Sequence, residues 1–346
     1  MFVVGFRGCE IGSDHWIVKA LERDMLGGVI FFDRNIDRSV QNIRSSEQLK
    51  QLVVCLQQHS VIPLFIAVDQ EGGAVCRLKE RDGFPPSVSA ANLAEQGLGA
   101  TKREAMSMAA LLADHGVNLN FAPVVDLDLN QDNPIISRYH RSFGEMPEAV
   151  VGHAAVFIEA HHQQGIGCCL KHFPGHGSAG SDSHLGFVDI TDYWQPVELE
   201  PYTRLIDSGY SDGIMTAHLV HRGLDPAGLP ATLSSQMVST ILRQQLGFTG
   251  VVFSDDLQMR AISNGWSYAE AVQQAVLAGV DVLVVGNNLD PREDVVRVGM
   301  QAIGELLDKG RIDENRIYES LTRIALLKEK IRGKQSWQHI VLPTAW

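Results

Sequence analysis

Short runs of apolar residues recur along the chain and are separated by longer amphipathic stretches. Most runs are rich in Val, Ile and Phe without strict alternation of apolar and polar residues. This pattern is typical of strands buried on both faces of a parallel sheet. We predict eight such strands, over residues 2–6, 27–32, 63–69, 118–126, 165–173, 212–218, 250–256 and 279–286.

The segments between these runs carry apolar residues at helical spacing. Helices are predicted over residues 15–25, 45–58, 101–114, 147–164, 195–208, 234–246, 266–277 and 293–307. In the stretch SYAEAVQQAVLAG, the helical pattern is followed by Gly279, a residue type that often ends a helix. One more amphipathic helix is predicted over about 311–332, ahead of a short tail.

Eight strand-helix units within about 300 residues indicate an α/β fold of the (β/α)8 TIM-barrel type. The competing arrangement is a doubly wound open sheet, but no Gly-x-Gly-x-x-Gly motif follows the first strand. We therefore expect one catalytic barrel domain over residues 1–346, with its strand-helix units in about 2–307. The connections at 70–100, 127–146 and 174–194 are long, and such loops in a compact domain are usually functional.

The composition narrows the classes of partner. The chain has 346 residues, of which 45% are hydrophobic and 20% charged, and its formal net charge is -12. An acidic balance disfavours general binding to nucleic acids or anionic membranes, so we expect neither as a partner. We expect a monomer that takes a small-molecule substrate. A local basic patch could still bind an anionic group.

The cysteines and the apolar runs bear on the compartment. Five cysteines, two of them adjacent at Cys168 and Cys169, offer neither a disulfide framework nor a Cys-x-x-Cys metal knuckle. We expect them to be small buried residues kept reduced. The chain shows no basic segment ahead of its first apolar run and no apolar span of roughly 18 residues. These features predict a cytoplasmic location.

Polar or ionisable residues stand where most of the predicted strands end. They are Asp69, Asp126, Lys171, His172, His218, Asp255, Asp256, Asn287 and Asn288. The carboxyl ends of barrel strands meet at one mouth, where barrel enzymes have their active sites. A single aspartate there, Asp256 for example, can simply cap the next helix. Capping does not explain ionisable groups at five successive strand ends, so the pattern predicts an enzyme.

The segment KHFPGHGSAGSDSH, residues 171–184, suits either metal binding or proton transfer. His172 and His176 have the i, i+4 spacing of two ligands on one helix, but the proline and glycines between and after them oppose a helix. A zinc site would also need a third ligand. That ligand would have to come from Asp182, His184 or the distant His218. We therefore favour proton transfer, with no metal and no organic cofactor.

Proton transfer is favoured by the spacing of Asp182 and His184. An aspartate two residues from a histidine can accept a hydrogen bond from one ring nitrogen, which fixes the tautomer and favours the imidazolium. With an ordinary pKa of about 6.5, such a histidine can act as an acid in one step and a base in the next. Lys171 and His172, at a strand end, are better suited to gripping substrate.

Two further motifs bring carboxylates to the mouth. GVVFSDDLQM delivers Asp255 from a buried strand, and a carboxylate opposite an acid–base group is the arrangement for retaining glycoside hydrolysis. VDQEGGAVCRL places Asp69 and Arg77 on one loop, where they suit bidentate hydrogen bonding to sugar hydroxyls or to an acyl group. The alternative is an internal salt bridge from Asp69 or Glu71 to Arg77, and both can hold together.

The ordered motifs resemble family three glycoside hydrolases over nearly the whole chain. The motifs are GFRG (5–8), GGVIFFDRN (27–35), DQEGGAVCRL (69–78), RSFG (141–144), KHFPGHG (171–177), DSH (182–184), MTAH (215–218) and FSDDLQM (253–259). The single-domain length and the DSH motif are most similar to the bacterial β-N-acetylglucosaminidase branch of peptidoglycan recycling. That branch removes non-reducing GlcNAc from GlcNAc-1,6-anhydro-MurNAc, with or without peptide, in the cytoplasm of Gram-negative bacteria.

The resemblance implies a role for each matching residue. Asp255 would be the nucleophile, His184 the general acid/base and Asp182 its partner. The sugar would be bound by Asp69, Arg77, Arg141, Lys171 and His172. Three alternatives stay open at this point: a phosphorylase that uses the same Asp–His pair, a metal-dependent hydrolase, and a non-catalytic barrel that binds muropeptides.

The metal-dependent alternative leads to a first prediction. Because proton transfer between Asp182, His184 and substrate needs no metal, we expect dialysis against EDTA to leave the hydrolysis of a chromogenic β-N-acetylglucosaminide unchanged. Loss of activity that added zinc restores would support the metal-dependent hydrolase instead.

Overall fold

The eight predicted strands are all present and form a closed parallel barrel. In a computed structural model, residues 1–23, 26–182 and 186–332 are described. The strands run in the order β10-β1-β2-β3-β4-β5-β7-β9, and a parallel bridge between Phe253 and Val282 joins the two outer strands. Their bounds are β1 (Phe2–Val4), β2 (Gly28–Ile30), β3 (Phe65–Val68), β4 (Leu119–Asn120), β5 (Gly167–Phe173), β7 (Gly213–Thr216), β9 (Val251–Ser254) and β10 (Leu283–Val285). The predicted (β/α)8 barrel is confirmed.

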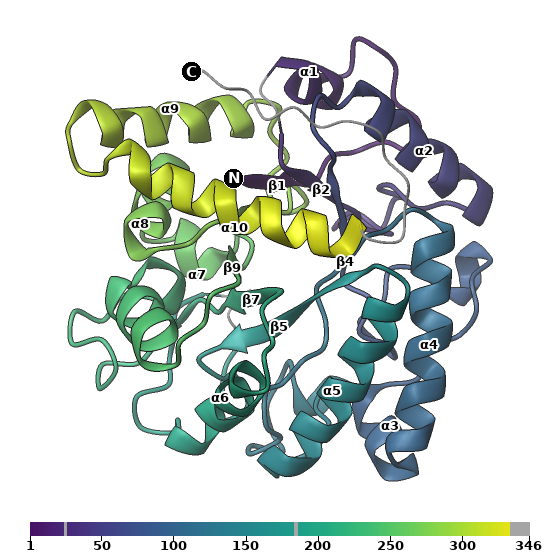
Figure 1. Cartoon of the computed structure of the whole chain (residues 1–346), viewed down its shortest axis with the longest axis vertical. Coiled ribbons are helices and arrows are strands. Elements are labelled where there is room, and N and C mark those ends of the chain that lie inside the picture. Colours follow the sequence, from purple (N-terminus) through teal and green to yellow (C-terminus); the bar gives the residue numbers. More distant parts are fainter. Residues whose placement is uncertain (24–25, 183–185, 333–346) are drawn as a thin grey trace.

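Helices ring the strands on the outside (Figure 1). They are α1 (Trp16–Arg23), α2 (Ser46–His59), α3 (Ala90–Gln96), α4 (Leu98–Asp114), α5 (Pro147–Gln163), α6 (Glu200–Asp207), the π-helix η5 (Gln236–Gln245), α7 (Arg260–Ser263), α8 (Tyr268–Ala278) and α9 (Val295–Asp308). A further helix, α10 (Glu314–Arg332), lies across the barrel (Figure 1). Within the described ranges, none of these helices is long and apolar enough to cross a bilayer.

The structure divides two of the predicted segments into smaller elements. The loop predicted at 70–100 contains α3, which begins after Ser89, whose side chain accepts the amide hydrogen of Asn92. Gly97, with φ at 85°, separates α3 from α4. The predicted helix 195–208 divides into a 3-10 turn, η3 (Pro196–Leu199), and α6, because Pro201 has no amide hydrogen with which to continue the helical ladder.

The strands are apolar on both faces, as the continuous apolar runs predict. Along β3, Phe65 and Ala67 point into the barrel, whereas Ile66 and Val68 pack under the surrounding helices. The rings of Phe65 and Phe121 each meet the ring of Phe253 edge to face inside the barrel. Filled with side chains in this way, the barrel is a packed core and not a channel.

Helix α10 closes the amino end of the barrel, lying across the strands in Figure 1. Its residues Ile324, Leu327 and Ile331 complete the apolar cluster of the barrel interior. Lys330 pairs with Asp212, which directly precedes β7. Because α10 covers the beginnings of the strands, the polar residues at their carboxyl ends are left at the opposite mouth.

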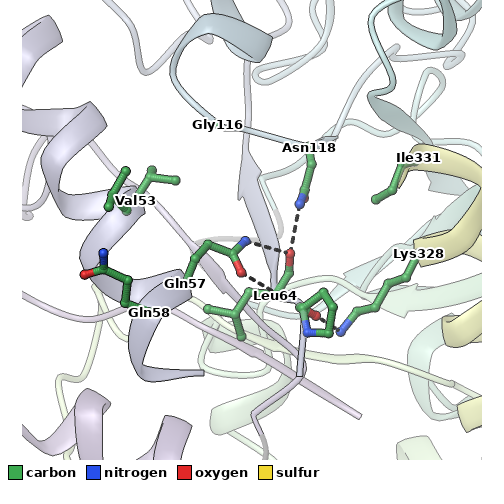
Figure 2. A pocket seen from close by; sticks show the side chains of 10 residues that line it. Val53, Gln57, Gln58, Leu64, Gly116, Asn118, Lys328 and Ile331 are labelled. Carbon is green, nitrogen blue, oxygen red and sulfur yellow. Dashed lines mark hydrogen bonds between the residues drawn. The ribbon is translucent and has the colours of Figure 1, made fainter. Parts of the chain in front are cut away.

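A pocket of about 360 Å³ opens between α2 and α10 at this same amino end (Figure 2). Lys328 borders the pocket, and its amine donates hydrogen bonds to the carbonyl oxygens of Gly27 and Pro63. Burial lowers the pKa of Lys328 to about 7. Because the pocket lies at the amino end of the barrel, it is remote from the strand ends that carry the predicted site residues.

One buried carboxylate anchors α10 to the barrel. Asp281, which has no exposed surface and precedes β10, pairs with Arg243 of η5 and with Arg323 of α10 at 3.0 Å. It also accepts hydrogen bonds from the hydroxyl of Ser320 (2.6 Å) and the amide of Val252 (2.9 Å). A single side chain thus holds the two helices η5 and α10 and the strand β9 together.

We predict that Asp281→Ala lowers the free energy of unfolding by about 3–5 kcal/mol, because partly buried arginines lose their carboxylate. Urea denaturation followed by circular dichroism measures the change. Glu319→Ala is the matched control, since Glu319 is an exposed partner of Arg323 and exposed pairs contribute little. Equal effects of the two substitutions would contradict the anchoring role of Asp281.

Candidate active site

The mouth of the barrel is organised around a buried lysine. Lys171, on β5, places its amine 2.8 Å from Oδ1 of Asp69 and 2.7 Å from Oε1 of Glu71. Asp69 follows the end of β3, and its other oxygen pairs with Arg77 at 3.0 Å. The predicted salt bridge between Asp69 and Arg77 is therefore present, whereas Glu71 pairs with Lys171 and with Arg141 instead of Arg77.

The loop after β3 owes its shape to the other residues of its motif. The side-chain oxygen of Gln70 accepts the amide hydrogens of Arg77 and Leu78, which closes the loop on itself. Gly72, with φ at 104°, lies so near the chain that an added Cβ would be 2.2 Å from the carbonyl oxygen of Val88. Only glycine fits there, so the motif sets both the charges and the backbone path of this wall.

A second layer holds Arg141 and His172. Arg141 donates two parallel hydrogen bonds to Glu71, both 2.7 Å long, and a third to the carbonyl oxygen of Ile135. Its Nη2 atom also lies 3.3 Å from Nε2 of His172. On the other side of the imidazole, Nδ1 lies 2.7 Å from the buried carboxylate of Asp126. Both ring nitrogens of His172 therefore have defined neighbours.

The electrostatics of this cluster hold its charges in place. Burial alone would raise the pKa of Glu71, but Arg141 and Lys171 outweigh burial and lower that pKa to about 2. Burial would also raise the pKa of Asp69, yet Lys171 and Arg77 hold it well below its usual range. The pKa of Lys171 is raised, because Asp69 and Glu71 outweigh its burial. Asp69, Glu71 and Lys171 are therefore all charged at neutral pH.

Asp255 stands on the side of the mouth opposite to Asp69. It follows β9, which lies four strands from β3 in either direction around the barrel. Its amide donates to the carbonyl oxygen of Thr216 on β7, and its Oδ1 accepts the amide hydrogen of Asp256 at 2.8 Å. Burial raises the pKa of the Cys169 thiol in the barrel interior, and the charges of Asp69 and Asp255 add to that rise. Both carboxylates therefore lie near enough to the barrel interior to influence this thiol.

The neighbouring polar residues at this end link the loops after the strands to one another. One oxygen of Asp256 accepts the amide hydrogens of Gln258 and Gly286, and so links the loop after β9 to β10. His218, beyond β7, contacts the hydroxyl of Thr232 and the carbonyl oxygen of Asp256. The expectation that Asp256 caps the next helix is wrong, because Met259 is the N-cap of α7 and no side chain caps that helix.

The loop that follows β5 is tied at both of its ends. Near its start, the amide of His176 donates to Asp126, and Asn133 donates to the carbonyl oxygens of His176 and Gly177. At its far end, β6 (Val188–Asp189) pairs with β8 (Leu219–Val220), just after His218. The loop therefore spans from β5 to the region beyond β7.

Asp182 and His184 are the predicted acid–base residues of this loop. Asp182 is half-buried, whereas His184 lies outside the described residues. An added Cβ at Gly186 would be 3.9 Å from Nδ2 of Asn264, which follows α7. Position 186, two residues beyond His184, therefore lies against the segment that follows Asp255.

The histidines in the first half of the loop are poorly placed for a metal ion. Nε2 of His172 faces the Arg141 guanidinium, which repels a cation. Burial lowers the pKa of His176 to about 4, and its ring packs edge to face on His172. In the described part of the chain, no three His, Cys, Asp or Glu side chains are grouped to hold a metal ion. His176 contributes to the packing of the loop.

The sequence matches the model of the glycosyl hydrolase family 3 N-terminal domain over residues 8–327. A β-hexosaminidase of Tolumonas auensis is 39% identical over 82% of this chain and 81% of its own length. A β-hexosaminidase of Nitrosomonas eutropha is 34% identical, with 92% and 90% covered. The chain belongs to glycosyl hydrolase family 3. It is therefore a glycoside hydrolase.

Solved structures of the family share the fold of this family 3 chain. A family 3 β-N-acetylglucosaminidase from a Paenibacillus species superposes with a TM-score of 0.86 and 32% identity. The match covers 99% of this chain but spans only 63% of the Paenibacillus protein. A β-N-acetylhexosaminidase of Beutenbergia cavernae gives a TM-score of 0.82 with 27% identity, and here 95% and 96% of the two chains are covered.

Two residues that build the site of this family 3 enzyme were not among the predicted site residues. Glu71 joins Lys171 to Arg141, and its place inside the DQEGG motif was the available signal. Asp126 orients His172, and its position at a strand end was the corresponding signal. Sequence spacing could not assign either partner, because each pairs with residues far along the chain.

We predict that Glu71→Gln destabilises the protein at pH 7 by about 3–5 kcal/mol, because Lys171 and Arg141 stay buried without their shared carboxylate. The lowered pKa of Glu71 means that its contribution is present above about pH 4.5 and is lost as the pH falls toward 2. Urea unfolding between pH 7 and 3 should therefore show a shallower acid limb for the variant.

The control for this prediction is Glu145→Gln, since Glu145 is exposed. We expect its free energy of unfolding to follow that of the wild type at each pH. If Glu71→Gln also followed the wild type, the buried cluster would not be the stabilising unit described above.

Proposed function

We propose that this chain is a retaining β-N-acetylglucosaminidase that releases the non-reducing terminal GlcNAc from GlcNAc-1,6-anhydro-MurNAc, with or without its peptide, in cell-wall recycling. The observation that carries the proposal is the position of Asp255 across the barrel mouth from the charged cluster of Asp69 and Lys171. The choice of an N-acetylhexosamine is supported by the names of the relatives, which are β-hexosaminidases.

The cluster suits a sugar ring. Hydroxyl groups both donate and accept hydrogen bonds, and the cluster supplies ionised acceptors on Asp69 and ionised donors on Arg77 and Lys171. These side chains hold one another in place before substrate arrives, so little ordering is needed on binding. A ring gripped on this side can present its anomeric carbon to Asp255 on the other.

The first step forms a glycosyl-enzyme. A carboxylate oxygen of Asp255 attacks C1 of GlcNAc, and the bond from C1 to the leaving O4 of anhydro-MurNAc breaks. His184, protonated and oriented by Asp182, donates its proton to that oxygen. The hydrogen bond from the amide of Asp256 to Asp255 orients the attacking carboxylate.

The second step returns the enzyme to its starting state. His184, now neutral, removes a proton from a water molecule whose oxygen attacks C1. The bond between C1 and Asp255 breaks, the carboxylate is regenerated, and GlcNAc leaves with its β configuration retained. Proton and electron-pair transfers balance over the two steps, and no cofactor takes part.

The cytoplasmic location stays a prediction from the sequence.

We predict that Asp255→Ala lowers kcat on an aryl β-N-acetylglucosaminide roughly a thousandfold or more, because the covalent step is lost. Azide should restore turnover and give the α-glycosyl azide, since the anion fills the space that Asp255 vacates. Asp290→Ala, at an exposed position near the same end of the barrel, is the control and should retain full activity. Wild-type rates in Asp255→Ala would refute the assignment.

The reaction itself is tested on GlcNAc-1,6-anhydro-MurNAc in phosphate buffer, with the first product followed by NMR. We expect β-GlcNAc and free anhydro-MurNAc, because water deprotonated by His184 is the acceptor in the second step. GlcNAc-1-phosphate would identify a phosphorylase instead. Absence of turnover on this substrate, with turnover of the aryl glycoside, would contradict the proposed substrate but not the chemistry.

A further inference from the structure

We propose that Glu198 is a positioning residue for the acid–base loop, because its carboxylate holds the first turn of the segment that leads from His172 to Asp182. The inference rests on the proposed function, in which that loop supplies the proton. Glu198 lies in the turn η3, ahead of α6, and is 1% exposed. It touches none of the residues to which the sugar-binding role is assigned, so its effect would be indirect.

The contacts of Glu198 converge on two residues of the loop. Oε2 accepts the amide hydrogens of Gly177 (3.0 Å) and Ser178 (3.4 Å). Oε1 accepts the hydroxyl hydrogen of Ser178 (2.6 Å) and the amide hydrogen of Gln195 (3.3 Å). Three of these four hydrogen bonds come from the loop, and the fourth fixes η3 itself. The carboxylate therefore ties the loop to the wall of the barrel.

The loop backbone fits closely around this side chain. An added Cβ at Gly175, where φ is 120°, would lie 2.6 Å from Cβ of Glu198. An added Cβ at Gly177 would lie 1.7 Å from the carbonyl oxygen of Leu127. Glycine at both positions lets the chain pass between Glu198 on one side and the loop after β4 on the other. The glycines of this segment therefore allow close packing.

Asparagine and tryptophan side chains also hold this segment, by donating hydrogen bonds to its carbonyl oxygens. Asn133 donates to His176 and Gly177, Asn130 donates to Ala179, and the indole of Trp194 donates to Pro174. The amide hydrogens are taken by carboxylates: Asp126 accepts from His176, and Glu198 accepts from the next two residues. Asp126 also orients His172, so Glu198 is the carboxylate dedicated to the loop.

The charge state of Glu198 responds near neutral pH. Burial raises its pKa to about 7, the hydroxyl of Ser178 opposes that rise, and the charge of Asp126 adds to it. Burial raises the pKa of Tyr202, on α6, and the charges of Asp126 and Glu198 add to that rise. Since an exposed glutamate titrates near 4.5, protonation favours the buried, loop-holding arrangement. The hold should weaken as the pH rises from 4.5 to 7, and then level off.

Two substitutions separate the parts of this proposal. Glu198→Ala removes every acceptor, and we expect kcat on an aryl β-N-acetylglucosaminide to fall between about 10- and 100-fold, with KM within about twofold, since a misplaced acid–base group slows chemistry without altering sugar binding. Glu198→Gln keeps one oxygen for the two loop amides and should restore most of kcat. Because glutamine does not ionise, the change in loop order between pH 4.5 and 7 should disappear.

The control is Glu200→Ala, two residues away in the exposed ion pair with Arg204, which should behave as wild type. Hydrogen exchange at the amides of Gly177 and Ser178 reports on the loop without any reaction. We expect lost protection in Glu198→Ala and retained protection in Glu198→Gln. A folded Glu198→Ala protein with wild-type kcat and protection would overturn the proposal. If the wild type fails to hydrolyse, the exchange result still decides the role of Glu198.

Discussion

The buried amine of Lys171 is the constraint on which the catalytic mouth depends. A lysine that is 3% exposed is stable only with paired carboxylates, and Asp69 and Glu71 supply them from a loop that starts at the end of β3. This pairing fixes the loop, and Glu71 in turn fixes Arg141. The same charges that stabilise the loop are those that can bind sugar hydroxyls, so stability and recognition share one set of interactions.

The two ends of the barrel are covered by different kinds of side chain. At the amino end, α10 covers the strand starts with apolar side chains and is held by the ion pairs of Asp281. At the carboxyl end, charged side chains take the place of an apolar cover. Because one end is closed by packing, loops at the other end can specialise without endangering the core.

The loop after β5 shows how a glycine-rich segment can be well held. Its carbonyl oxygens accept hydrogen bonds from asparagine and tryptophan side chains, and its amides donate hydrogen bonds to Asp126 and Glu198. Glycine allows these groups to approach the backbone, so here it serves contact as much as motion. In the proposed reaction, the proton donor is then carried by a loop anchored on the same aspartate that orients the imidazole of His172.

The sequence by itself determined the barrel, its eight strands and the positions of Asp69, Lys171, His172 and Asp255 at strand ends, because apolar periodicity and strand order are local properties. Only the tertiary structure decided the pairing of charges that lie far apart along the chain. Lys171 lies 102 residues from Asp69, and Arg141 lies 70 residues from Glu71. Glu198 had no local signal at all. Such partners are chosen by the closure of the barrel, which brings strand ends together irrespective of their separation along the chain.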